Sequence, residues 1–186
     1  GSGKSTLIED VLVASLLAGR PVGCSALEGL LVHPVFVDQS PIGHNPRSNP
    51  ATYTKLADIL RDLFAAATGL PASYFSFNRP EGACPRCNGM GALEVSLRYL
   101  PSTWIRCDDC GGQRFSDEVL AAQVRFGQQR LSIADVLARP IAAVADMLHG
   151  DQRLSASQRA AASAILQALC DIGLGYLPLG QPSPTL

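Results

Sequence analysis

The spacing of apolar residues predicts a chain of mostly short helices interrupted by a few strands. Apolar residues recur at helical spacing over 54–68, and Gly69 and Pro71 end that run. Further helices are predicted at 7–17, 133–138, 141–149 and about 156–172. Apolar residues alternate with polar ones over 93–99, which predicts a strand with one buried face. Shorter strands are predicted at 30–37 and 119–126.

Capping signals fix where the helices of the second half begin and end. Ser132 is a cap for the helix at 133–138. Pro140 opens the next helix, and Gly150 stops it. Ser155 and Gln158 have the spacing of a capping box before the last helix. These helices are expected to form the core rather than to carry chemistry.

Length and composition bound the class of protein. The chain has 186 residues, which is enough for one large or two small domains, and two are expected. Charged residues make up 17% and the formal net charge is −1, so any contact with nucleic acid must be local. No signal peptide opens the chain and no apolar run is long enough to span a membrane. These features predict a soluble, cytoplasmic protein with no membrane partner.

Four cysteines form two Cys-x-x-Cys pairs, as expected for two thiolate knuckles that share one tetrahedral zinc ion. The predicted ligands are Cys84, Cys87, Cys107 and Cys110. Four sulfur ligands leave no position for a catalytic water, so this zinc should be structural. Glycines follow each pair, at Gly89 and at Gly111 and Gly112, where the chain must turn tightly. The alternative for these four cysteines is a disulfide pair or a redox-active Cys-x-x-Cys. The two remaining cysteines, Cys24 and Cys170, are predicted to be buried thiols.

The first six residues have the pattern that closes a phosphate-binding loop, G-x-x-x-x-G-K-[ST]. The residues are Gly1, Ser2, Gly3, Lys4, Ser5 and Thr6. Backbone N–H groups at glycines wrap the phosphates of ATP, Lys4 reaches the β and γ oxygens, and Ser5 offers a hydroxyl to Mg²⁺. The helix at 7–17 should be buried, with its N-terminus facing the phosphates. A flexible linker with this composition by chance is the alternative.

The predicted strand at 30–37 leads into a distinctive stretch at 38–53, Asp-Gln-Ser-Pro-Ile-Gly-His-Asn-Pro-Arg-Ser-Asn-Pro-Ala-Thr-Tyr. This stretch resembles a segment in the C-terminal half of the UvrA family, the damage-recognition ATPases of bacterial nucleotide excision repair. The resemblance extends over essentially the whole chain. It includes the phosphate loop, Phe75–Asn78, Leu100-Pro101 within the cysteine-rich region, 173–176 and 179–182. Together these motifs are specific, whereas the phosphate loop alone is not.

The resemblance implies an α/β fold with two parts. Residues 1–53 would be part of a P-loop nucleotide-binding domain of ABC type, and 54–186 an inserted α+β domain of signature type. The inserted domain would carry the zinc ribbon at about 80–116. Gln39 would be the Q-loop glutamine that reaches Mg²⁺ or the attacking water. Arg47 matches a family arginine at the DNA backbone, and His44 stands where the family has arginine, which weakens that contact.

The implied function belongs to a longer protein, since both ends of the chain look cut. In the family, the signature motif, Walker B and the switch histidine would follow Leu186. Full-length protein should therefore hydrolyse ATP and recognise DNA damage through ATP-driven changes in a dimer, whereas this piece should not hydrolyse ATP. The implied partners are damaged double-stranded DNA, a second copy of the full-length protein and a UvrB-type helicase.

Other readings remain open at the level of sequence. His44, the stretch 99–104 and the short distance between Thr6 and Asp38 depart from the family pattern, as expected for a divergent paralogue concerned with tolerance of DNA-binding drugs. A DnaJ-like zinc module or a structural zinc adaptor without ATPase activity are alternatives of another class. Nucleotide binding by the full-length protein would separate both from the ATPase.

Arginines near the predicted ribbon are further candidates for DNA contact. They are Arg86, Arg98, Arg106 and Arg114. Taken singly, each is expected to lie on a solvated face. Arg47 is the stronger candidate, because its turn-rich surroundings should present it outward beside Gln39.

Overall fold

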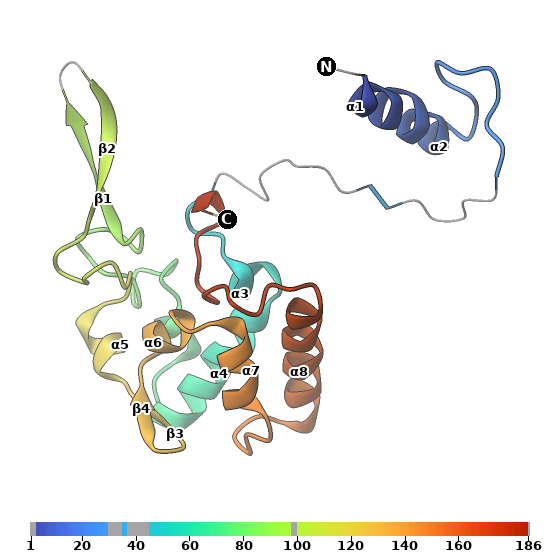
Figure 1. Cartoon of the computed structure of the whole chain (residues 1–186). Coiled ribbons are helices and arrows are strands. Elements are labelled where there is room, and N and C mark those ends of the chain that lie inside the picture. The colour runs from blue at the N-terminus through green and yellow to red at the C-terminus, as the bar shows by residue number, and fades with distance from the viewer. Residues whose placement is uncertain (1–2, 30–34, 37–44, 98–99, 186) are drawn as a thin grey trace. The chain divides into compact units, whose positions relative to one another are not determined.

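The chain divides into two compact units, Gly1–Ser40 and Pro41–Leu186, whereas the sequence suggested a boundary after residue 53. The structure is a computed structural model that describes residues 3–29, 35–36, 45–97 and 100–185 (Figure 1). Each unit is described by itself. Among these described residues, no helix is both long enough and apolar enough to cross a membrane.

The first unit contains one continuous helical segment over 4–18. It comprises α1 (Lys4–Thr6), the π-helical η1 (Leu7–Val13) and α2 (Ala14–Ala18). The helix ends at Gly19, whose φ of 62° gives a left-handed cap. Ser15 is its buried residue, and the Ser15 hydroxyl accepts a hydrogen bond from the Val22 backbone N–H at 2.9 Å.

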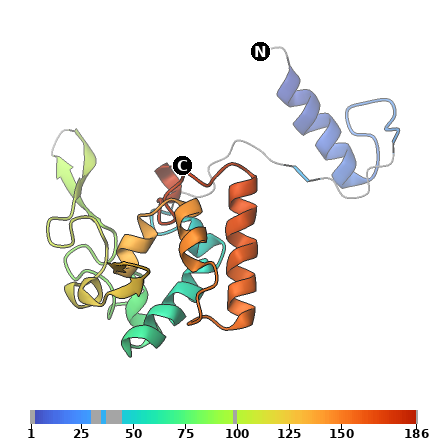
Figure 2. The same ribbon diagram turned by 60° about the horizontal axis from the view of Figure 1, so that its bottom comes forward.

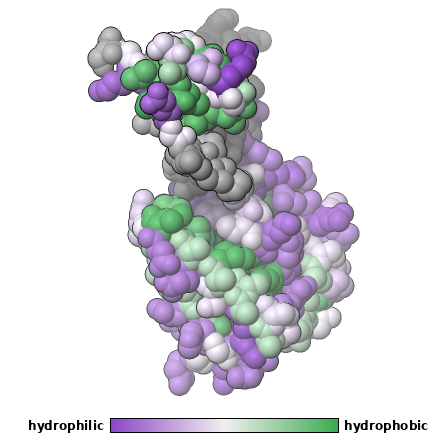
Figure 3. Space-filling model, turned by 90° about the vertical axis from the view of Figure 1, so that its right-hand side faces the viewer, coloured by the Kyte–Doolittle hydropathy of each residue, from purple (hydrophilic) through white to green (hydrophobic). Residues whose placement is uncertain are grey.

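The helix predicted at 7–17 is confirmed, but its predicted burial is wrong for this unit. Leu7, Ile8, Leu12 and Leu17 are all exposed, with Leu17 79% exposed. Figure 3 shows hydrophobic side chains on the surface of this unit. Within the described residues, only the loop at 20–29 folds back toward the helix, and one short loop cannot cover an apolar helix face.

The strand predicted at 30–37 lies for the most part outside the described residues. Val35 and Phe36 are described, and neither is in a strand. Gln39 and His44 also lie outside the described residues.

The second unit is mainly helical. Its α-helices are α3 (Pro50–Tyr53), α4 (Leu56–Thr68), α5 (Asp117–Ala121), α6 (Ile133–Leu137), α7 (Ile141–Leu148) and α8 (Ala156–Asp171). Two 3₁₀ helices accompany them, η2 (Ala72–Phe75) and η3 (Ser183–Thr185). Helix α4 contacts both α6 and α8, and α7 packs against α8 (Figure 2).

Helix α4 supplies the centre of the hydrophobic core. Its buried residues are Leu56, Leu60, Leu63 and Phe64, which recur at the predicted helical spacing. The Phe64 ring lies 5.4 Å from that of Phe75 and 6.2 Å from that of Phe126, measured between centroids. The helix ends as predicted at Gly69, where φ is 79°.

The predicted caps in the second half are confirmed. The Ser132 side chain accepts from the Asp135 backbone N–H, and the Ser155 side chain accepts from the Gln158 backbone N–H. Both form capping boxes. Sequence reasoning missed a third box, in which Asn49 and Thr52 cap α3.

The strand predicted at 119–126 is wrong in its first half, which is the end of helix α5. Ser116 is extended at the N-cap position, and Asp117 and Glu118 place acidic groups in the first turn, where they favour a helix. The second half is β3 (Val124–Phe126), which pairs antiparallel with β4 (Gln129–Leu131). The sequence did not predict β4.

The second hairpin pairs β1 (Ala92–Leu97) with β2 (Leu100–Arg106) and projects from the helical part of the unit (Figure 1). The predicted strand is confirmed, but its fully buried face is not. Leu93 and Val95 are only half-buried, and Trp104 and Ile105 are 54% and 47% exposed. A two-stranded ribbon that projects has a neighbour only at its base, so neither face can be covered along its length.

Candidate functional site

The four predicted zinc ligands meet in one buried cluster. Their sulfur atoms all lie within 4.8 Å of one another, in the order Cys84, Cys87, Cys107 and Cys110 along the chain. The sulfurs of Cys84 and Cys107 are 3.9 Å apart, and those of Cys87 and Cys110 are 3.7 Å apart. A tetrahedral zinc ion with Zn–S bonds of about 2.3 Å requires sulfur separations of about 3.8 Å. A disulfide requires about 2.05 Å, so the cluster has the spacing of a metal site.

The backbone around the cluster is folded to donate hydrogen bonds to sulfur. The Gly91 N–H donates to the Cys87 sulfur at 3.2 Å, and the Arg114 N–H donates to the Cys110 sulfur at 3.4 Å. Such N–H···S bonds stabilise thiolates that bind a metal. The turn also depends on Gly89, whose φ is 77°, since a Cβ there would lie 1.9 Å from the Phe77 carbonyl oxygen.

Burial makes an uncompensated thiolate cluster unfavourable. It raises the pKa of the Cys110 thiol to about 12 and also raises the pKa of Cys87. Hydrogen bonding from the Cys110 backbone lowers the pKa of Cys107. A divalent cation stabilises the deprotonated form of every ligand, and four sulfurs complete its coordination. The cluster therefore fits a structural zinc ion.

Two arginines connect the cluster to the segment at 45–49. Arg47 donates to the Asn88 carbonyl oxygen at 2.9 Å and to the Met90 sulfur at 3.4 Å. In the opposite direction, Arg114 donates to the Pro46 carbonyl oxygen at 3.1 Å. We call these interactions the arginine clamp. Sequence reasoning expected Arg47 to point outward and missed its contact with the first knuckle, because Asn88 and Arg47 are far apart in sequence.

The other ribbon arginines differ in their surroundings. Arg86 forms an exposed ion pair with Asp109 at 2.8 Å, and Arg106 donates to the Gly111 carbonyl oxygen at 2.6 Å. Arg114 does not fit the expected solvated face, because it is half-buried and its guanidinium lies 5.1 Å from the centre of the Phe77 ring. Arg98 lies outside the described residues.

The described part of the predicted phosphate loop forms the start of the first helix. Gly3 has a φ of 71°, and its carbonyl oxygen accepts from the Leu7 N–H at 3.0 Å. Lys4, Ser5 and Thr6 are exposed in the first helical turn. A left-handed glycine before an exposed lysine and hydroxyl is what a phosphate-binding turn requires. Gly1, Ser2 and Gln39 are outside the described residues, so the complete loop stays a prediction.

The two ends of the second unit lie side by side. The Ser183 N–H donates to the Ser48 carbonyl oxygen at 2.8 Å, and the Ala51 N–H donates to the Leu179 carbonyl oxygen at 3.1 Å. The second of these bonds joins the stretch at 38–53 to the stretch at 179–182, which were two of the motifs that carried the resemblance, and the first joins Ser48 to the residue that follows the latter stretch.

Comparison with known proteins gives one consistent result. No family model matches the chain. UvrABC system protein A of Thermus thermophilus is 41% identical over 199 residues, which cover 100% of this chain and 20% of that protein. The corresponding proteins of Aquifex aeolicus and Mycobacterium tuberculosis are 40% and 38% identical, again over the whole chain.

A solved structure agrees with the sequence comparison. The crystal structure of UvrA2 from Deinococcus radiodurans matches with a TM-score of 0.75 and 41% identity. The match covers 100% of this chain and 22% of that one. The chain is therefore, over its whole length, a UvrA-family sequence that spans about a fifth of the length of its relatives.

Proposed function

We propose that the chain is part of a UvrA-like protein that binds ATP and DNA and recognises DNA damage in nucleotide excision repair. The observation that carries this proposal is the match of the whole chain to UvrABC system protein A at 41% identity. In this proposal the full-length parent forms a homodimer, changes its arrangement with ATP, and passes damaged DNA to a UvrB-type helicase.

The first unit would contribute to the nucleotide site. Backbone N–H groups at residues 1–6 would hold the phosphates, with Lys4 reaching the β and γ oxygens and Ser5 binding Mg²⁺. Gln39 would sense the γ-phosphate. The left-handed Gly3 and the exposed Lys4 support this role. Hydrolysis of ATP would be an activity of the full-length parent.

The second unit would contribute a zinc-stabilised surface for DNA. Zinc would fix the two knuckles, and the arginine clamp would then fix the segment at 45–49 against the first knuckle. Residues 40–44 separate that segment from Gln39 in sequence. Zinc ribbon, DNA-facing loop and nucleotide sensor would therefore be joined by one short connection, which supports coupling between ATP and DNA.

The experiment that tests the proposal is a Lys4→Ala variant of the full-length parent. The substitution removes the cation of the phosphate loop, so ATP hydrolysis should fall to background. Lys55→Asn is the matched control, because it removes the chain's other lysine at a left-handed position that asparagine tolerates. Hydrolysis by Lys4→Ala at the rate of the unmodified protein would contradict the nucleotide role.

A second readout separates repair from drug tolerance. The unmodified parent should restore survival after ultraviolet irradiation in a bacterium that lacks its own UvrA, and Lys4→Ala should not. Rescue of growth only in the presence of a DNA-binding drug would instead identify the paralogue. A protein that binds zinc but no nucleotide would be the structural adaptor.

A further inference from the structure

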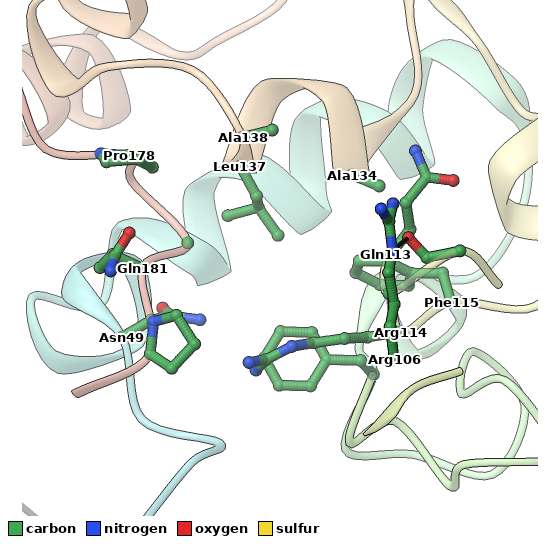
Figure 4. A pocket seen from close by; sticks show the side chains of 15 residues that line it. Asn49, Arg106, Gln113, Arg114, Phe115, Ala134, Leu137, Ala138, Pro178 and Gln181 are labelled. Carbon is green, nitrogen blue, oxygen red and sulfur yellow. Dashed lines mark hydrogen bonds between the residues drawn. The ribbon is translucent and has the colours of Figure 1, made fainter. Parts of the chain in front are cut away.

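A hollow of about 290 Å³ lies in the second unit, beside the second knuckle, and a few polar side chains interrupt its largely apolar lining. In Figure 4, Asn49 and Gln181 lie on one side of it and Arg106, Arg114 and Gln113 on the other, with Leu137 between the two sides. Its walls therefore come from five places in sequence: the α3 cap, Phe77, the second knuckle, α6 and the segment at 178–182. None of the roles proposed above uses this hollow.

The Asn49 side chain brings an unpaired donor to the hollow. Asn49 is 1% exposed, and its Oδ1 atom accepts from the Thr52 backbone N–H at 2.9 Å as part of the α3 cap. That bond fixes which end of the amide is nitrogen. The Nδ2 atom has no hydrogen-bond partner among the described residues. A buried donor without a partner is costly, so an acceptor supplied through the hollow would stabilise it.

The two arginines bring positive charge that no carboxylate neutralises. Their hydrogen bonds go to neutral backbone carbonyls, from Arg106 to Gly111 and from Arg114 to Pro46. Over the described ranges neither arginine forms an ion pair, and none of the described residues that line the hollow is acidic.

We propose that this hollow is a binding site for a phosphate group, held by Asn49 Nδ2 on one side and by the guanidinium groups of Arg106 and Arg114 on the other. Donors that face each other across a hollow need an acceptor whose oxygens point in several directions. A tetrahedral phosphate meets that need, whereas the two oxygens of a carboxylate lie in one plane and serve one side. All residues of the site belong to the second unit, and the proposal does not depend on the proposed function.

The test follows the Asn49 side-chain amide signal of the whole chain by NMR during titration with inorganic phosphate. Ionic strength is kept constant with potassium chloride, and acetate serves as a second anion. Phosphate should shift the Asn49 signal with saturation, and acetate should not. A linear response that acetate reproduces would overturn the proposal.

A duplex of 12 base pairs distinguishes two sources of phosphate. If the duplex shifts the same Asn49 signal and competes with inorganic phosphate, the site takes a nucleic-acid backbone phosphate. If inorganic phosphate binds and the duplex does not compete, the site takes a free phosphate group. Both results support a phosphate site, and failure of both probes to shift the signal refutes it.

Two substitutions test the named side chains. Asn49→Asp keeps the cap acceptor but replaces the unpaired donor with a carboxylate oxygen that repels phosphate, so it should abolish phosphate binding, which in this variant is followed at the side-chain signals of Arg106 and Arg114. Arg106→Gln is exposed enough to fold normally and should weaken phosphate binding at least fivefold. Arg86→Gln, in the same ribbon but paired with Asp109, is the control and should leave binding unchanged. Unchanged phosphate binding in both Arg106→Gln and Asn49→Asp would overturn the assignment.

Discussion

At the scale of single residues, the knuckles depend on positions that only glycine fills well. Gly89 combines a φ of 77° with a backbone oxygen 1.9 Å from where a Cβ would lie, so both the conformation and the space exclude a side chain. Gly111 has a φ of 53°, but its nearest neighbour to such a Cβ is 3.6 Å away. The two glycines therefore separate the cost of backbone conformation from the cost of a steric clash.

We predict that Gly89→Ala destabilises the second unit far more than Gly111→Ala. The left-handed conformation should cost each variant about 1–2 kcal/mol. Only Gly89→Ala must also displace the Phe77 carbonyl, so it should lose zinc as well. Denaturant unfolding and zinc content, measured on both variants, check this. Equal losses of stability in the two variants would show that the close approach at residue 89 does not matter.

At the scale of elements, the sequence predicted features that depend on neighbouring residues, such as helix caps. It did not predict features that depend on tertiary contacts. The caps at Ser132 and Ser155 were predictable because a cap depends on residues within one turn. The sequence did not predict strand β4, because its residues are mostly polar and it pairs with β3 only after a tight turn. The exposure of Trp104 could not be predicted either. Alternating apolar and polar residues indicate a strand with two different faces, but not whether another element covers either face.

The zinc ribbon is the element whose order should depend on a single ion. We predict that Cys84→Ser removes stoichiometric zinc and lowers the stability of the second unit, because a structural zinc site contributes its binding energy to folding. Cys170→Ser is the matched control, because Cys170 lies outside the cluster. This variant should keep one zinc ion per chain. Elemental analysis measures the zinc content, and the fluorescence of Trp104 reports whether the β1–β2 hairpin is folded. Stoichiometric zinc in Cys84→Ser would show that another ligand set holds it.

At the scale of the whole molecule, the sequence identified which groups carry chemistry but not how they are connected. Cysteine spacing was enough to predict the cluster, because a shared metal imposes it. The arginine clamp joins residues from opposite ends of the ribbon to the segment at 45–49, and no local pattern encodes such a contact. The unpaired amide of Asn49 was hidden for the same reason, since burial and lack of a partner arise only on folding.

We predict that Arg47 contacts DNA through the part of its guanidinium group that the first knuckle leaves free. Its Nη2 atom binds Asn88 and its Nε atom binds Met90, which leaves the donors of Nη1 for a phosphate oxygen. In the full-length parent, Arg47→Ala should therefore weaken binding to damaged and undamaged duplex alike. It should also lower the slope of log affinity against log salt by about one, as expected for one lost phosphate contact.

Two variants separate this contact from the arginine clamp. Arg47→Lys keeps the charge but lacks the planar fork that reaches two acceptors, so it should retain the salt slope and lose affinity. Arg86→Ala removes an exposed arginine that Asp109 already neutralises, so it should change neither quantity. If Arg47→Ala reduces affinity with an unchanged slope, Arg47 acts only by holding the first knuckle in place. If Arg47→Ala changes neither the affinity for DNA nor its salt dependence, the segment at 45–49 does not contact DNA.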